Sequence, residues 1–168
     1  MFETAILSAI ALAMIVAAFY DVTTLTIPNW LSLVLVGLFP AAGILAGFGP
    51  ADWVWHLAIG FAALCAGIAV FAFGFAGGGD AKLFAAGALY MGFAQIGQFV
   101  FAVALAGGAL VLCLLIVRRV PLPLALLSRP WVARLYQKGQ GVPYGVAIAI
   151  GALMVLPQTH LAAGLTQL

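Results

Sequence analysis

The sequence carries very little charge. Of its 168 residues, six are Lys or Arg and four are Asp or Glu, so charged residues make up 6%, whereas about a quarter is usual for a soluble domain. This scarcity excludes a soluble enzyme, a nucleic-acid-binding protein and a disordered segment, because each needs far more charge. Hydrophobic residues make up 67% and the mean hydropathy is +1.27, more apolar surface than a fold in water can bury. The sequence therefore predicts an integral membrane protein.

Cysteine and histidine are also scarce. Cys65 and Cys113 lie far apart inside apolar runs, so we expect small apolar side chains there, with neither a disulfide framework nor a C-x-x-C zinc site. His56 and His160 have no evident co-ligands, and no metal or cofactor is predicted. Residues 1–4 lack the positive charge of a secretory signal, so we interpret the apolar run that follows as a retained first span.

Apolar runs long enough for membrane helices follow one another along the chain. A span needs about 20 apolar residues, and we predict an all-α, polytopic membrane protein in which residues 1–168 form a single domain with six transmembrane helices. The predicted spans cover residues 5–20, 30–48, 54–75, 83–94, 99–117 and 142–160. Residues 83–117 are too long for one crossing of a ~30 Å core at ~1.5 Å per residue. We therefore place a bend at Gln95, Gly97 and Gln98.

The basic residues predict the orientation of these spans. Five of the six lie between the fifth and sixth spans, namely Arg118, Arg119, Arg129, Arg134 and Lys138. The positive-inside rule places this segment in the cytoplasm. Counting back over pairs of spans then puts Asp21, Asp80 and Lys82 on the same side, and both termini outside with Glu3 and Asp52. Because residues 118–141 also contain several Leu residues, a Trp and a Tyr, we expect a cytoplasmic, interfacial loop that contacts anionic membrane lipids.

Asp21 and Asp80 stand in the most unusual turns, although each has a simple structural explanation. Asp21 could mark the end of the first span, and Asp80, after three glycines, could cap the helix that follows it. Asn29 could cap the second span, with Pro28 fixing the chain before it. Lys82 could extend along the helix to the lipid headgroups.

Together, the two aspartates indicate chemistry. Ionisable groups at a bilayer are costly and tend to be functional. Two carboxyl groups brought close together cannot both ionise easily, so the pair holds a shared proton. That state suits peptide hydrolysis: the ionised carboxylate activates a water molecule, and the protonated one donates a hydrogen bond to the scissile carbonyl.

Two motifs resemble the signatures of the type IV prepilin peptidase family. The first is Asp21 followed, after five residues, by Ile27-Pro28-Asn29, and the second is Gly77-Gly78-Gly79-Asp80-Ala81-Lys82-Leu83, which is similar to the G-x-G-D-x-K-L form of these membrane aspartic peptidases. The segment Val142–Ala149 also resembles the opening of their last span. Either motif alone is weak, and the pair is specific.

The resemblance implies a catalytic pair, Asp21 and Asp80, supported by Pro28, Asn29, Gly77, Gly79 and Lys82. It implies a substrate, the short basic leader of a pilin-like precursor, cut at the cytoplasmic face of a bacterial-type inner membrane. Longer family members have an extra cytoplasmic region with a cysteine zinc site and also methylate the new N-terminus. This chain has neither feature, so we expect a peptidase without methyltransferase activity, similar to the short forms of tight-adherence (Flp) pilus systems.

Other classes of membrane protein remain open from the residues alone. An ion-coupled carrier could use the two aspartates as proton or cation sites, although carriers usually place such groups near the bilayer midplane. A non-catalytic subunit of a pilus or secretion machine would need the aspartates only as helix caps. A divalent-metal enzyme acting on a phosphate is a further alternative, but neither a phosphate-binding loop nor a denser acidic cluster supports it. The oligomeric state is not predicted.

Overall fold

The computed structural model describes residues 2–137 and 141–166, and within them the secondary structure is entirely helical, as predicted. The elements are α1 (Phe2–Thr24), α2 (Asn29–Leu45), α3 (Pro50–Ala72), α4 (Gly78–Val117), α5 (Leu124–Leu127), α6 (Pro130–Tyr136), α7 (Tyr144–Val155), the 3₁₀ helix η1 (Leu156–Gln158) and α8 (His160–Thr166). Lys138, which we placed among the cytoplasmic basic residues, lies outside the described residues.

Apolar side chains cover the outside of the bundle. Leu12, Phe19, Leu33, Phe61 and Phe101 are each at least 60% exposed, which suits lipid as the surrounding solvent. By length and composition, α1, α3 and α4 could each cross a membrane, whereas α2 and residues 144–158 form shorter apolar helices of 10–17 residues. The helices are therefore those of a membrane protein, and the number of six spans stays a prediction.

The long helix α4 changes direction at Gly92, which has φ 61° and ψ −172° inside otherwise helical backbone. We predicted a bend in this stretch, but its position at Gln95–Gln98 was wrong, since those residues are helical. Only a residue without a Cβ adopts the conformation of Gly92 readily. The bend lets the second half of α4 fold back on the first, so that the rings of Phe84 and Phe99 stack with centroids 5.0 Å apart.

His56 of α3 stabilises this bend. Its Nδ1 lies 2.6 Å from the carbonyl oxygen of Leu89, and because a carbonyl can only accept, Nδ1 donates the proton. The side chain is buried, with 6% exposed, and a Cβ at position 92 would lie 2.7 Å from its Nε2. His56 therefore fills the space beside the broken helix.

Replacing Gly92 by Ala is expected to destabilise the fold. Alanine at this φ and ψ costs about 1–3 kcal/mol in backbone strain, and the new methyl group would collide with His56. The matched control is Gly97→Ala, because Gly97 is helical and a Cβ there meets nothing within 4 Å. Unfolding in detergent should show a lower midpoint for the first variant and an unchanged or higher one for the second; equal midpoints would contradict the role of Gly92.

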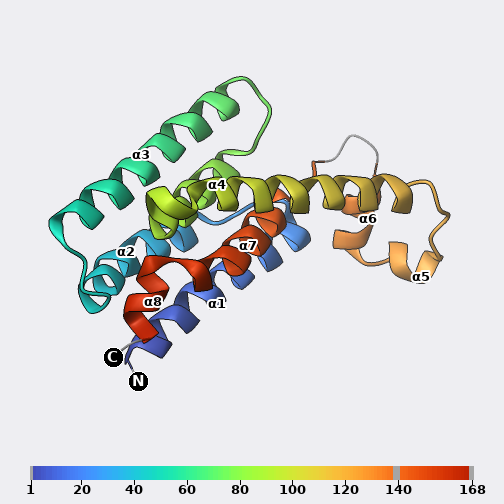
Figure 1. Ribbon diagram of the computed structural model, residues 1–168. Coiled ribbons are helices and arrows are strands. Elements are labelled where there is room, and N and C mark those ends of the chain that lie inside the picture. The colour runs from blue at the N-terminus through green and yellow to red at the C-terminus, as the bar shows by residue number, and fades with distance from the viewer. Residues whose placement is uncertain (1, 138–140, 167–168) are drawn as a thin grey trace.

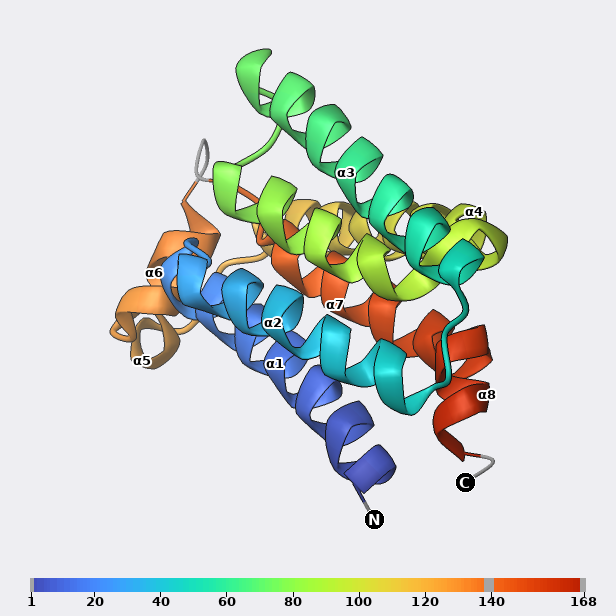
Figure 2. The same ribbon diagram turned by 90° about the vertical axis from the view of Figure 1, so that its left-hand side faces the viewer.

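The first half of α4 is the central helix of the bundle. It packs against α2, α3 and α7, while α1 lies against α2 and α7 (Figure 2). Residues 85–92 are all buried, and most are small, so neighbouring helices approach closely: a Cβ at Gly67 of α3 would lie 2.9 Å from the Cβ of Ala81. Close approach of small residues is the usual way in which membrane helices pack.

Residues 118–137, the described part of the basic segment up to the gap, contain two short helices, α5 and α6. The helix α6 packs against α1 and α4 (Figure 1). Arg134 donates a hydrogen bond to the carbonyl oxygen of Thr23 at 3.1 Å, and Arg118 Nε donates one to that of Leu135 at 2.8 Å. The bond from Arg134 holds the basic segment against the end of α1 that carries Asp21, and the bond from Arg118 joins the start of the segment to the end of α6.

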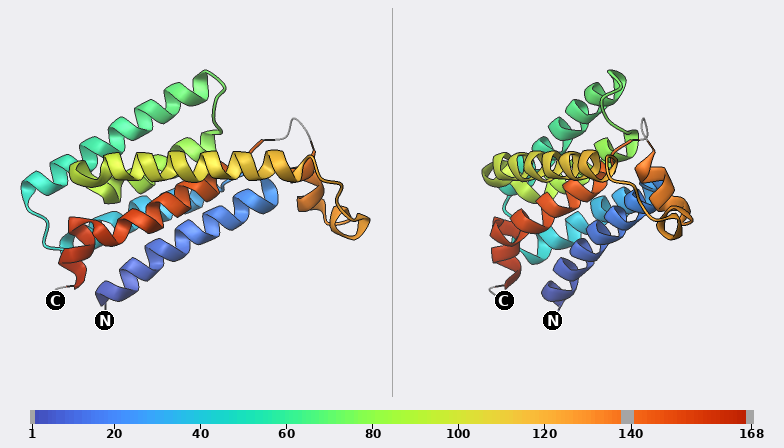
Figure 3. Two further views of the ribbon diagram at one scale, coloured as in Figure 1. Left: turned by 45° about the vertical axis from the view of Figure 1, so that its right-hand side comes forward. Right: turned by 90° about the vertical axis from the view of Figure 1, so that its right-hand side faces the viewer.

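The start of α1 and the end of α8 lie at the opposite end of the bundle from α5 and α6, as the left view of Figure 3 shows, and the two helices contact each other. The orientation of both termini toward one side of the membrane stays a prediction. The sixth apolar segment breaks earlier than we expected, because η1 follows α7 at Leu156 and α8 begins at His160.

Candidate active site

Asp21 lies in the last turn of α1, not in the loop after the first span, where we expected it. The helix continues to Thr24. The hydroxyl group of Thr23 donates to the carbonyl oxygen of Phe19 at 2.8 Å, and that of Thr24 donates to the carbonyl of Tyr20 at 2.7 Å. Both bonds run from a threonine side chain back to the preceding turn of the same helix, so these hydroxyl groups are used within α1. Asp21 lies on the buried side of α1, with 4% of its surface exposed.

The carboxyl group of Asp21 is fixed by α7. The backbone N–H of Gly145, in the first turn of that helix, donates to Asp21 Oδ2 at 2.6 Å. The N-terminus of a helix favours a negative charge through its free N–H groups. A Cβ at position 145 would lie 2.8 Å from the same oxygen and 2.7 Å from Ile27 Cδ1, so only glycine permits this approach without a shift.

Asp80 lies in the first turn of α4, where its Oδ2 accepts a hydrogen bond from the backbone N–H of Gly77 at 3.2 Å. Asp52 has the same local arrangement at the start of α3, since its Oδ2 accepts from the N–H of Gly49 at 2.9 Å. Gly77 is the N-cap residue and Asp80 follows it by three positions, so the carboxyl group stabilises the helix start as we expected, from the third helical position. Asp52 and Asp80 therefore each stabilise the start of their own helix. Of the two, only Asp80 faces Asp21.

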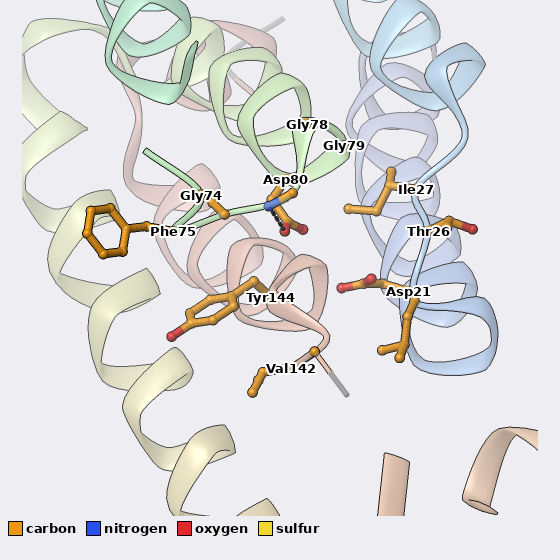
Figure 4. A pocket seen from close by; sticks show the side chains of 14 residues that line it. Asp21, Thr26, Ile27, Gly74, Phe75, Gly78, Gly79, Asp80, Val142 and Tyr144 are labelled. Atoms are coloured by element: carbon orange, nitrogen blue, oxygen red, sulfur yellow. Dashed lines mark hydrogen bonds between the residues drawn. The ribbon is translucent and has the colours of Figure 1, made fainter. Parts of the chain in front are cut away.

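A single cavity of about 530 Å³ joins the two aspartates. Figure 4 shows the side chains of Asp21 and Asp80 pointing toward each other from α1 and α4, with Tyr144 of α7 beside them. The two carboxyl groups are close enough to interact electrostatically. The cavity is lined by Asp21, Leu25, Thr26, Ile27, Gly74, Phe75, Ala76, Gly77, Gly78, Gly79, Asp80, Gly141, Val142 and Tyr144. The two sequence motifs, far apart along the chain, therefore form one site.

Ile27 holds the three parts of this site together. It is buried, with 8% exposed, in the connection between α1 and α2. A Cβ at Gly79 would lie 3.1 Å from Ile27 Cβ, and one at Gly145 would lie still closer to its side chain. The starts of α4 and α7 thus both pack on Ile27 through a glycine, which sets the spacing between Asp21 and Asp80.

The other predicted site residues have different positions. Gly77 and Gly79 line the cavity, whereas Pro28, Asn29 and Lys82 do not. Pro28, not Asn29, is the N-cap residue of α2. The Asn29 side chain instead accepts a hydrogen bond from Lys82 Nζ at 2.9 Å. This bond links α2 to α4, and the Asn29 side chain does not cap α2. Lys82 is exposed and connects the start of α4 to the start of α2.

Gly145 and Tyr144 belong to the site, although the sequence motifs did not predict them. Both lie in Val142–Ala149, a segment that resembles the start of the family's last span and to whose residues we assigned no role. Periodicity could not find them, because their importance comes from a contact between α7 and the end of α1.

The donor set of the cavity consists of carboxyl groups. Among the described residues, no group of three or more His, Cys, Asp or Glu side chains comes together, and His56 and Asp52 lie outside the cavity lining. Asp21 and Asp80 each have one oxygen bound to a backbone N–H. Among the described residues, no group is bonded to the second oxygen of either, and such a carboxyl oxygen can bind a water molecule or share a proton.

Fold and site together define a helical membrane protein with an acidic pair at one end of its bundle. The model of the type IV leader peptidase family matches residues 8–112, which is more than half of the sequence. The chain therefore belongs to this family, and it is a membrane peptidase, a hydrolase. The matched range contains Asp21 and Asp80 and ends before α7. No curated protein and no solved structure gave a significant match.

Proposed function

We propose that this chain is an aspartic endopeptidase that removes the short basic leader from type IV pilin-like precursors at the cytoplasmic face of a bacterial inner membrane. The observation that carries the proposal is the meeting of Asp21 and Asp80 across one cavity, each with one oxygen fixed by a backbone N–H. Pilin-like precursor and membrane lipids are the proposed partners, and no methyltransferase activity is proposed.

In the proposed mechanism, the aspartate pair shares one proton and holds a water molecule. The ionised carboxyl group accepts a proton from this water, whose oxygen attacks the scissile carbonyl carbon, while the other carboxyl group donates its proton to the carbonyl oxygen. The tetrahedral intermediate then collapses: the carboxyl group that took the water proton donates it to the amide nitrogen, the ionised carboxylate accepts a proton from one hydroxyl group of the intermediate, and the C–N bond breaks. The pair again shares one proton. The bonds from Gly145 and Gly77 support this sequence because they hold both carboxyl groups in place throughout.

The surroundings of the pair support a substrate that is extended at the cut and enters from the basic end of the molecule. Gly77, Gly78 and Gly79 form one wall of the cavity and present backbone without side chains, so an extended peptide can approach closely. Arg118 and Arg134 lie on the segment beside this end, which by the positive-inside rule faces the cytoplasm. The proposed cut therefore falls just before the substrate enters the membrane.

The test is cleavage of a pilin-like precursor by the purified protein in proteoliposomes. The expected result is a single cut that releases the leader, identified by mass spectrometry of both products. The matched substrate control replaces the leader's last residue, Gly, by a bulky residue, and it should be cut poorly. Intact precursor in the presence of folded protein would refute the proposal. Ion-dependent uptake into the same vesicles would then favour the carrier, and its absence would favour a non-catalytic subunit.

A further inference from the structure

A further cavity lies between α2 and α3, away from the aspartate site. Both helices pack on the first half of α4, which lies between them in Figure 2. The cavity has a volume of about 600 Å³, and it shares no lining residue with the aspartate cavity. We call it the α2–α3 groove. Three of its lining side chains are polar, Asn29, Ser32 and Lys82, and the rest of its lining is apolar.

The three polar side chains lie at one end of the groove, where α2 and α4 begin. Lys82 Nζ donates to Asn29 Oδ1 at 2.9 Å, and among the described residues Lys82 forms no ion pair. Two of its three N–H groups are therefore left to donate, together with the side-chain N–H groups of Asn29. No Asp or Glu lines the groove, so this end offers a positive charge and several hydrogen-bond donors to an anion.

Ser32 is an independent sign of a polar ligand at this end. It follows Asn29 by three residues, so the two side chains share a face of α2. Only 7% of Ser32 is exposed, and its hydroxyl group forms no hydrogen bond within residues 2–137 and 141–166. No described side-chain oxygen or nitrogen is both fully buried and without a partner, so the hydroxyl group is accessible from the groove. A largely buried hydroxyl group without a partner is costly, and a hydrogen bond to a ligand would remove that cost.

The rest of the groove is apolar and is open to lipid along its side. From Lys82 to Leu89, α4 advances by seven residues, or ~10 Å, which is within one leaflet of a ~30 Å core. Ala85 is buried at the bottom of the groove, with 7% exposed, whereas Leu33 and Phe61 at its rim are each 69% exposed. A long apolar chain that starts at the polar end can therefore lie against the protein on one side and against lipid on the other.

The volume and charge of the groove favour a phospholipid over a helix. A cavity of about 150 Å³ holds a benzene ring, so about 600 Å³ has room for about 20 carbon atoms, on the order of one acyl chain. Two turns of an α-helix, which match the length of the groove, would need roughly 800–1,200 Å³. Basic pockets between membrane helices on the cytoplasmic side bind anionic lipid headgroups, and the positive-inside rule predicts that side for Lys82.

We infer that the α2–α3 groove binds one anionic phospholipid of the cytoplasmic leaflet. The phosphate group of the lipid accepts hydrogen bonds from Lys82 Nζ, Asn29 and Ser32, and one acyl chain lies in the apolar part between α2 and α3. The bound lipid joins the start of α2 to the start of α4, beside the aspartate pair but not in contact with it. This inference goes beyond the proposed function, because it assigns a ligand to a site that the peptidase chemistry does not use.

Substitutions at the two ends of the groove separate the headgroup from the acyl chain. Lys82→Gln removes the charge and Lys82→Arg keeps it. The matched control is Arg119→Gln, because Arg119 is exposed and lies outside the groove lining. Val36→Trp fills the apolar part from its rim, where Val36 is 46% exposed. Its matched control is Val34→Trp, since Val34 is 41% exposed on the same helix and does not line the groove.

The experiment measures bound lipid by native mass spectrometry of the purified protein in detergent, titrated with phosphatidylglycerol or with phosphatidylcholine of the same acyl chains. We expect the wild-type protein to retain one phosphatidylglycerol and to bind it about tenfold more tightly than phosphatidylcholine, because hydrogen bonds to a charged group are the stronger ones. Lys82→Gln should lose this preference and Lys82→Arg should keep it. Val36→Trp should bind both lipids about tenfold or more weakly, since the loss of contact with two CH₂ groups already costs this much. Both controls should behave as the wild type.

Equal affinity of the wild-type protein for the two lipids would overturn the assignment, as would a preference that survives in Lys82→Gln. Unchanged lipid binding in Val36→Trp would overturn it as well; if that variant also lost precursor cleavage, the groove would hold the substrate helix instead. Unfolding midpoints without added lipid show whether each variant is folded, and Leu57→Trp, which fills the groove from α3 at a 53% exposed position, replaces Val36→Trp if that variant is not. Lipid binding is measured without substrate, so failure of the proposed peptidase function would leave this test unaffected.

Discussion

Replacing Asp21 or Asp80 by Asn is expected to reduce the rate of precursor cleavage by about 10²–10⁴-fold, the range of general acid–base catalysis. Asparagine keeps the size of the side chain and an oxygen that can accept the bonds from Gly145 and Gly77. It cannot ionise, so it can neither accept a proton from water nor share one with its partner. The fold should therefore persist while the chemistry is lost.

The matched control is Asp52→Asn. Asp52 accepts the same local bond from the glycine three residues before it as Asp80 does, but it does not line the aspartate cavity. Rates should be compared in proteoliposomes at equal protein, with unfolding in detergent as a check on folding. Normal cleavage by Asp21→Asn or Asp80→Asn would contradict the assignment of these two residues as the catalytic pair. An equally large loss in Asp52→Asn would contradict it as well.

Gly145→Ala is expected to cause the second large effect, a loss of about 10²-fold in cleavage rate. The added methyl group would lie 2.8 Å from Asp21 Oδ2 and 2.7 Å from Ile27 Cδ1, so the carboxyl group must move away from its partner. Displacements near 1 Å in a catalytic arrangement can cost this much. Steady-state kinetics should show the loss mainly in kcat, because the glycine-lined wall of the cavity is unchanged.

The control for this prediction is Gly108→Ala. Gly108 is a helical glycine of α4 at which a Cβ would meet nothing within 4 Å, so alanine should leave activity unchanged and raise helix stability by up to about 1 kcal/mol. Unfolding midpoints distinguish a local displacement from a general loss of structure. If Gly145→Ala cleaved as fast as Gly108→Ala, the contact between α7 and Asp21 would have no part in positioning the carboxyl group.

Much of this site was predictable because two short motifs carry it. The three glycines before Asp80, and the Ile-Pro-Asn after Asp21, identify the family and the acidic pair from local sequence alone. The family match over residues 8–112 confirms the family. The pairing of the aspartates as catalytic groups stays a prediction, which the geometry of the cavity supports.

Helix ends and bends were less predictable. Polar residues suggested that the first span ends at Tyr20 and that the long apolar stretch bends near Gln95. In the structure, α1 continues to Thr24, and the bend lies at Gly92, between the apolar residues Met91 and Phe93. A bend inside a buried helix depends on a backbone conformation and on a partner such as His56, and hydropathy carries information on neither.

The sequence by itself determined the solvent, the helical class and the two aspartates, because composition, hydropathy and short motifs are local properties that need no partner. Only the tertiary structure decided that Gly145 fixes Asp21, and that Ile27 spaces the starts of α4 and α7. Each of these is a contact between helices far apart along the chain. Close packing of small residues creates such contacts, and their geometry depends on all the helices at once.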